Sequence, residues 1–155
     1  MHQISPEGIA FLEEKEGFRG DAYYDVAGVL TIGYGHSTRA PSIEQYPVYE
    51  GQHITEEEGE EILRADLKPT EAAVNSAVTR DITQKQYDAL VSFTFNLGTG
   101  AFKSSKVLSY TNAGNYQAAA DELLQYSYAG GEFIPGLRKR REEERAMYLS
   151  SLPQG

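Results

Sequence analysis

Glu16 is the first residue in the chain whose type and position could do chemistry. It follows Ile9 and Leu12 at helical spacing, on a face where another buried apolar side chain is expected. Partial burial raises the pKa of a carboxyl group, which lets it act as a general acid near neutral pH. The competing interpretation is an ordinary acid at a helix end that points into solvent.

Two more polar residues follow at short spacing. Asp25 lies nine residues after Glu16, and Thr31 lies six residues after Asp25. Each has an ordinary explanation, because Asp25 precedes Val-Ala-Gly and suits a turn, while Thr31 suits a strand. Neither residue indicates a site by itself.

The chain has no cysteine, which excludes disulfides, thiolate nucleophiles and cysteine-ligated metals. The three histidines, His2, His36 and His53, show none of the close spacings that bind metal as a pair. We therefore predict no metal and no cofactor. Carboxylates, hydroxyls and imidazoles remain as the groups that could do catalysis.

The elements around Glu16 can be predicted from local signals. Residues 5–7, Ser-Pro-Glu, predict a helix start, and Gly17 predicts its end. From Asp21 the sequence changes to Tyr, Val, Thr and Ile with glycines between them, which predicts short strands and tight turns. Residues 37–53 have no clear period, and we expect a surface loop there.

Helices are predicted for most of the remaining chain. Capping boxes at Thr55–Glu58 and Thr83–Gln86 begin two of them. We expect Pro69 to interrupt or kink the first before it continues to Val78. The second, which ends at Gly98, is strongly apolar and is the predicted central core helix. Shorter helices are expected near 105–110 and 115–126, and a last one, after breaks at 130–131 and 135–136, to Leu149.

The predicted fold class is α+β and predominantly helical, in a single domain over residues 1–155. We expect a small α/β-hairpin lobe at about 1–54, a long connecting helix at about 55–79 and a helical lobe at about 80–155. A cleft between two such lobes is a common place for a ligand.

Charge is distributed unevenly along the chain, whose net charge is −9. Residues 1–80 carry 6 basic and 15 acidic side chains, whereas residues 81–155 carry 8 of each. Such a surface repels nucleic acid, so no nucleic-acid partner is predicted. The basic run 138–141 is followed at once by three glutamates, and the i,i+4 pairs predict a solvated helix face.

The sequence does not predict a membrane anchor. No stretch without Asp, Glu, Lys or Arg is longer than the 14 residues 89–102, short of the roughly 20 that span a bilayer. The N-terminus has neither a basic region nor an apolar region of a secretory signal. We therefore expect synthesis in a cytoplasm.

The polar residues become specific when they are taken together. Glu16-Gly17, Asp25, Gly28 and the run 31–36, Thr-Ile-Gly-Tyr-Gly-His, resemble the active-site signature of phage-type lysozymes (endolysins, glycoside hydrolase family 24). The resemblance continues through residues 86–102 and 136–145 and covers most of residues 4–150. The chain is therefore identified as a member of this family, with a lysozyme-like two-lobe fold.

The resemblance implies hydrolysis of the β-1,4 bond between N-acetylmuramic acid and N-acetylglucosamine in peptidoglycan. Glu16 would be the general acid that protonates the glycosidic oxygen. Asp25 would stabilise the oxocarbenium-like transition state and polarise a water that Thr31 helps to hold. The family is taken to invert the anomeric carbon, which requires room for that water, with carboxyl groups roughly 6.5 to 9.5 Å apart.

The resemblance also implies roles outside catalysis. His36 matches a structural histidine that pairs with a carboxylate, for which Asp66 is the best match. Substrate contacts are expected from both lobes, and core packing is an equal alternative for the phenylalanine; these residues are Ser37, Phe95, Asn96, Ser105 and Tyr128.

The implied partners are bacterial peptidoglycan and a holin, which would permeabilise the membrane so that the chain, made in the host cytoplasm, reaches the wall in the periplasm. Nothing in the pattern demands an oligomer, so we expect a monomer. A net charge of −9 provides no long-range attraction toward an anionic polymer.

Two alternative functions remain open at this stage. A lytic transglycosylase would cleave the same bond with one glutamate and without water, although the presence of Asp25 and Thr31 argues against it. A non-hydrolytic peptidoglycan-binding scaffold would bind walls without releasing reducing ends.

Overall fold

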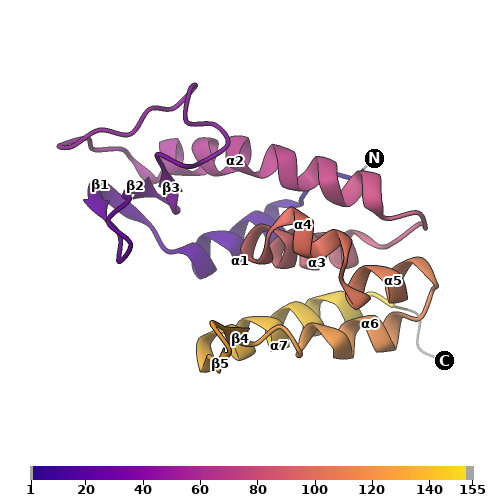
Figure 1. Cartoon of the computed structure of the whole chain (residues 1–155). Coiled ribbons are helices and arrows are strands. Elements are labelled where there is room, and N and C mark those ends of the chain that lie inside the picture. The colour runs from indigo at the N-terminus through magenta and orange to yellow at the C-terminus, as the bar shows by residue number, and fades with distance from the viewer. Residues whose placement is uncertain (1, 153–155) are drawn as a thin grey trace. The chain divides into compact units, whose positions relative to one another are not determined.

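The computed structural model describes residues 2–152, and Figure 1 shows the helices and strands of this range. In chain order they are α1 (Pro6–Glu16), β1 (Arg19–Tyr24), β2 (Leu30–Gly33), β3 (His36–Ser37), α2 (Glu56–Ala77), α3 (Gln84–Leu97), α4 (Thr99–Lys103), α5 (Lys106–Asn112), α6 (Tyr116–Leu123), β4 (Tyr128–Ala129), β5 (Glu132–Phe133) and α7 (Pro135–Leu149). The predicted class, α+β and predominantly helical, is confirmed.

The chain forms two compact units. Residues Ile9–Pro69 make one, called the hairpin unit below. Residues 2–8 and 70–152 of the described range make the other, called the helical unit. The divisions fall inside α1 and inside α2.

The hairpin unit contains an antiparallel sheet in the order β1-β2-β3. Thr31 lies in the central strand, where it pairs with Tyr23 of β1 and with Ser37 of β3. The neighbouring Ile32 packs with Ile54 and Ile62 in the buried core of the unit. Because side chains alternate along a strand, this packing of Ile32 fixes the direction of Thr31 on the other face.

The surface loop predicted over residues 37–53 is found, although Ser37 itself belongs to β3. Turns follow one another through most of the loop. Two of its side chains, Tyr46 and Val48, pack against the core of the hairpin unit. The loop is therefore attached to the unit by apolar contacts as well as by its two ends.

Capping residues begin the helices where the sequence places them. Ser5 Oγ accepts from Gly8 N at 3.1 Å, and Asp88 Oδ1 accepts from Ser5 N at 3.0 Å. Both capping boxes form, one between Thr55 and Glu58 and the other at the start of α3. Asp88 had no signal in the sequence, because it acts across 83 residues of chain.

Pro69 does not interrupt α2, which runs from Glu56 to Ala77. The expectation of an interruption was wrong. Proline removes one backbone N–H, and the helix continues through this position without that donor.

The helical unit is built around α3, as predicted. Every residue from Gln86 to Thr94 is buried, and the helix ends where Gly98 N donates to Thr94 O at 2.8 Å. α3 packs against α7, and α6 packs against both α5 and α7. The strongly apolar sequence of α3 is explained by burial on all of its faces.

A small hairpin was missed. β4 and β5 pair through Tyr128 with Phe133 and Ala129 with Glu132. The two turn residues, Gly130 and Gly131, both have positive φ, which is the conformation that a two-residue hairpin turn requires. The Gly-Gly pair was interpreted only as a break between helices, although it is also a hairpin signal.

The basic run on α7 is not a solvated face. Arg138 pairs with Glu142 near the surface, but Arg140, Arg141 and Glu144 are buried. Glu144 Oε1 accepts from Arg141 Nη1 at 2.8 Å and Oε2 accepts from Arg140 Nε at 3.3 Å. The i,i+4 spacing predicted the Arg138–Glu142 and Arg140–Glu144 pairs correctly, but not the Arg141–Glu144 pair. It also could not show that α7 turns Arg140 and Arg141 toward α3.

Gly59 of α2 provides a test of packing in the hairpin unit. A Cβ at this position would lie 2.8 Å from Phe18 Cε1 and 3.2 Å from Tyr34 Cε2. Overpacking costs about 1 to 3 kcal/mol, whereas Ala in place of Gly in a helix gains about 1 kcal/mol. We expect Gly59→Ala to lower the free energy of unfolding, measured by urea titration. Gly136→Ala is the control, because no atom lies within 4 Å of its new methyl group; equal stability of both variants would contradict the packing.

Candidate active site

Glu16 is the last residue of α1 and is half-buried. Its carboxyl group lies against Gly35 in the turn between β2 and β3. A Cβ on Gly35 would be only 3.3 Å from Glu16 Oε1, and Gly35 has a φ of +76°. A glycine is needed here for both reasons, since a side chain would strain the turn and crowd the carboxyl group.

Asp25 follows β1 and sits in the turn that leads to β2. Its Oδ1 accepts from the backbone N–H groups of Ala27 and Val29, each at 2.9 Å. Its Oδ2 has no hydrogen-bond partner within residues 2–152. Asp25 is thus the turn residue that its sequence context predicts, and it also keeps one carboxylate oxygen for a ligand or a water.

Thr31 is linked to Asp25 through one backbone oxygen. The carbonyl of Val29 accepts from Asp25 N at 3.0 Å and from Thr31 Oγ1 at 2.8 Å. The hydroxyl of Thr31 therefore uses its hydrogen on Val29 and retains lone pairs that can accept from a water. In the β1–β2 connection, Asp25 and Thr31, two of the three predicted catalytic residues, therefore bond to the same carbonyl oxygen.

His36 and Asp66 form the predicted pair. The two side chains are almost fully buried, and His36 Nδ1 lies 2.7 Å from Asp66 Oδ2. His36 Nε2 lies 2.6 Å from the carbonyl oxygen of Tyr46. A carbonyl and a carboxylate only accept, so both ring nitrogens donate and the imidazole is positively charged. Burial opposes this charge, but the hydrogen bonds to Asp66 and Tyr46 prevail and raise the pKa of His36 above 6.5.

Asp66 also holds the start of the loop that follows β3. Its Oδ1 accepts from Ser42 Oγ at 2.6 Å and from Ser42 N at 3.2 Å. One carboxylate therefore fixes Ser42 directly and Tyr46 through His36. Sequence reasoning did not find Ser42, because no local pattern signals a contact with a helix 24 residues away.

The predicted substrate-contact residues lie in both units. Ser37 is half-buried in β3, and its Oγ accepts from Arg39 N at 3.1 Å. Phe95 and Asn96 lie near the end of α3, the former half-buried and the latter exposed. Ser105 is buried as the N-cap of α5, where its Oγ accepts from Leu108 N at 3.1 Å. Tyr128 is exposed on β4.

Two of these residues share a hollow in the helical unit. Asn96 and Tyr128 line a space of about 320 Å³ together with Tyr126, Leu137 and other residues. Arg141 forms part of the same wall, donates from Nε to the carbonyl of Tyr126 at 2.9 Å and donates from Nη2 to Asn96 Oδ1. The amide group of Asn96 is thereby oriented with its N–H donors away from Arg141.

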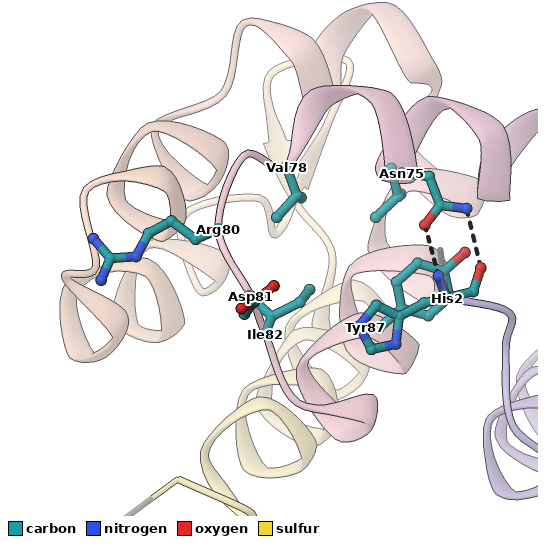
Figure 2. Close-up of a pocket in the computed structure, with 8 residues that line it drawn as sticks. His2, Asn75, Val78, Arg80, Asp81, Ile82 and Tyr87 are labelled. Atoms are coloured by element: carbon teal, nitrogen blue, oxygen red, sulfur yellow. Dashed lines mark hydrogen bonds between the residues drawn. The ribbon is translucent and has the colours of Figure 1, made fainter.

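A different hollow, of about 270 Å³, contains none of the predicted site residues (Figure 2). His2 stacks on Tyr87 with 4.9 Å between ring centroids, and Asn75 bonds to the backbone of His2 at both N and O. In Figure 2 the guanidinium of Arg80 points away from these rings. The observed contacts serve to hold the start of the chain.

Neither a metal site nor a membrane span is found in the part of the chain that the structure describes. Within residues 2–152 no group of three His, Asp or Glu side chains is arranged to hold a metal ion. None of the helices in the same range is both long and apolar enough to cross a membrane.

Comparison with known proteins identifies the family. The sequence profile of the phage lysozyme family matches residues 13–144. The chain belongs to the phage lysozyme family. The match includes Glu16, Asp25 and Thr31 and extends to Glu144 of the buried cluster on α7.

Relatives within this family are similar over almost the whole chain. The endolysin of Salmonella phage P22 is 44% identical over 151 residues, which is 97% of this chain and 100% of that protein. The endolysin of Bacillus phage B103 is 44% identical over 149 residues, or 95% of this chain and 54% of that protein. The chain thus spans about half the length of the B103 relative.

Solved structures agree with this assignment. A variant of P22 lysozyme has a TM-score of 0.87 and 43% identity, covering 96% of this chain and 99% of that one. The muramidase domain of SpmX from Asticaccaulis excentricus has a TM-score of 0.85 and 35% identity, with 96% and 99% coverage. The predicted lysozyme-like fold and the predicted family of enzyme are confirmed.

The buried charges on α7 are a further feature of this phage lysozyme that sequence reasoning missed. Ser92 of α3 donates to Glu144 at 2.6 Å, and the guanidinium of Arg141 lies 5.0 Å from the ring centroid of Phe93. A signal was present, because Arg141 and Glu144 lie between Leu137 and Tyr148 at helical spacing. The same logic that singled out Glu16 on α1 applies to this face of α7.

The His36–Asp66 pair predicts how stability depends on pH. The folded-state pKa of His36 is raised, so its stabilisation is complete below about pH 6.5 and is lost as the pH rises through the folded pKa. We expect the free energy of unfolding, measured in urea, to fall over this window in the unmodified chain. Asp66→Asn should lower the free energy of unfolding by about 3 kcal/mol at low pH and by little at high pH. Parallel pH profiles for the two proteins would contradict the ion pair.

Proposed function

We propose that the chain is a muramidase that hydrolyses the β-1,4 bond between N-acetylmuramic acid and N-acetylglucosamine in peptidoglycan. The observation that carries this proposal is the geometry of the β1–β2 connection. Asp25 and Thr31 share the carbonyl of Val29, and each keeps an acceptor for a water. Membership of the phage lysozyme family supports the same reaction.

Glu16 is the proposed general acid. As the glycosidic C–O bond breaks, its carboxyl proton passes to the leaving oxygen, and positive charge develops on the sugar ring. The turn at Gly35 leaves room beside Glu16 Oε1, and the half-buried helix end holds the side chain in place.

Asp25 and Thr31 are proposed to hold the attacking water. A water that donates one hydrogen to Asp25 Oδ2 and the other to Thr31 Oγ1 directs a lone pair away from the protein. Attack on the anomeric carbon forms the new C–O bond, and Asp25 takes up the proton that the water loses. The carboxylate also stabilises the positive charge on the ring. Water entering opposite the leaving oxygen inverts the anomeric carbon.

Contacts with the glycan are proposed for Ser37, Phe95, Asn96 and Tyr128. Asn96 offers an N–H donor whose direction is set by Arg141, and it suits a carbonyl such as that of an acetamido group. Tyr128 offers an exposed ring beside the same hollow, which suits a sugar face. Ser105 contributes by starting α5, since its hydroxyl already donates to Phe102 O at 2.7 Å.

The biological role that fits this activity is host cell lysis by a phage endolysin. Several relatives carry that name, among them the P22 protein. We propose that the chain is made in the host cytoplasm, reaches the wall once a holin has permeabilised the membrane, and acts as a monomer. Other relatives are called SAR-endolysins, including one from Escherichia phage Mu that is 38% identical over 126 residues.

Substitution of the proposed acid tests the mechanism. Glu16→Gln keeps the shape of the side chain and removes its proton, so we expect wall hydrolysis to fall by about 10² to 10⁴ with an unchanged thermal unfolding curve. Release of reducing ends from purified peptidoglycan measures the rate. Glu14→Gln is the matched control, because Glu14 lies on the exposed side of the same helix. Near-full activity of Glu16→Gln would remove Glu16 from the acid role.

Tyr128 provides a test of substrate contact. Tyr128→Ala removes a stacking surface worth about 1 kcal/mol, so we expect KM to rise about fivefold with little change in kcat. Phe133→Ala is the control, because Phe133 is the cross-strand neighbour of Tyr128 and does not line the hollow. Equal effects of the two variants would assign the loss to the hairpin rather than to a contact.

A further inference from the structure

A groove in the hairpin unit lies between the loop after β3 and the start of α2. Its volume is about 180 Å³. Ile54 and Ile62 form its buried floor, and Tyr46, Pro47 and Tyr49 form its walls. Tyr49 is 59% exposed, so much of its ring faces solvent at the edge of the groove.

The walls of the groove are fixed before any ligand arrives. His36 holds the carbonyl of Tyr46, as described above, and Gln52 Nε2 donates to the carbonyl of Pro47 at 3.2 Å. Gln52 Oε1 in turn accepts from Tyr49 N at 3.2 Å. A preformed apolar groove binds with a smaller loss of conformational entropy than a flexible loop.

Two carboxylates at the rim of the groove lack a lysine or arginine partner. Glu58 accepts from Thr55 N at 3.0 Å, and Glu61 interacts with the hydroxyl of Tyr46. Within residues 2–152 no Lys or Arg forms an ion pair with either carboxylate, whereas the nearby Glu60 is paired with Arg64. The capping bonds from Thr55, and to a smaller extent the charge of His53, lower the pKa of Glu58, which favours its charged form.

The charge of the whole unit favours a cation. The hairpin unit has 13 acidic and 5 basic side chains, a net charge of −8, so it accounts for nearly all of the −9 of the chain. An apolar groove with aromatic walls and carboxylates at its rim is complementary to an alkyl chain that ends in an ammonium group.

We propose that this groove binds the amine-bearing side chain of the diamino acid in a peptidoglycan stem peptide. Its methylene groups contact Ile54 and Ile62, and its ammonium group lies between Glu58 and Glu61. The proposal rests on peptidoglycan being the substrate, because the diamino acid of the stem supplies this chemistry in the wall.

The groove also gives the acidity of the unit a function. An acidic surface receives no long-range attraction from the carboxylates of the wall. Stem amines are the cations of the same polymer, and a groove selective for them lets an acidic enzyme stay close to its substrate.

The test uses a lysine-type stem tetrapeptide and the same peptide acetylated at the lysine Nε, titrated into the unmodified chain. Neither peptide contains a glycosidic bond, so binding is measured without turnover, from backbone amide shifts in the NMR spectrum. We expect the free-amine peptide to shift Ile54 and Ile62, and the acetylated peptide to bind about tenfold more weakly.

Paired variants separate the groove from the overall charge. Glu58→Gln combined with Glu61→Gln should weaken binding about tenfold. Gln serves the capping position equally well, as Gln86 does in α3. Glu56→Gln combined with Glu57→Gln removes the same charge from neighbouring positions that do not line the groove, and should change binding less than about twofold.

Three results would overturn the proposal: equal binding of the two peptides, equal effects of the two paired variants, or shifts confined to residues outside the groove. Reducing ends released from whole peptidoglycan are measured in parallel. If hydrolysis is observed while the peptide results fail, only the groove assignment falls. If no hydrolysis is observed, the proposed function fails independently of the peptide titration.

Discussion

The carbonyl oxygen of Val29 is the atom on which the proposed chemistry depends. It accepts from Asp25 N and from the Thr31 hydroxyl, so it closes the turn and orients a side chain with the same two bonds. Because the hydroxyl of Thr31 donates its hydrogen to this carbonyl, it accepts a hydrogen bond from a water. The rest of the hairpin unit keeps this connection rigid, through the core packing of Ile32 and the bonds of Asp25 Oδ1 to the turn.

The loop after β3 and the proposed groove depend on a different buried group, the carboxylate of Asp66. It fixes Ser42 with one oxygen and, through His36, the carbonyl of Tyr46 with the other. A buried ion pair contributes little net stability by itself, but loss of one partner is costly. The pair is better understood as a constraint on where the loop lies than as a source of stability.

Much of this architecture could be predicted from short sequence patterns. Local signals located the starts of α1, α2 and α3. These predictions are correct because caps depend on neighbouring residues. Glu16, Asp25 and Thr31 became candidates only through the resemblance of their pattern to the phage-type lysozyme signature. The hairpin of β4 and β5 had a local signal too, in Gly130-Gly131, but it was interpreted only as a helix break.

The remaining features depend on contacts between distant residues. The run of arginines followed by glutamates predicts a solvated Arg141, yet α7 buries both Arg141 and its partner Glu144 against α3. Asp88 caps a helix 83 residues away, and Asp66 fixes a serine in a loop. In the sequence, such contacts are indicated only by a charged residue on an otherwise apolar helix face. This pattern does not identify the partner residue.

The anomeric configuration of the first product tests the central claim most directly. Purified peptidoglycan would be digested by the unmodified chain and followed at once by NMR, with product masses determined in parallel. Water held by Asp25 and Thr31 predicts a reducing muramic acid end in the α configuration, the inverted product. A β product, or an anhydro product formed without water, would contradict the account.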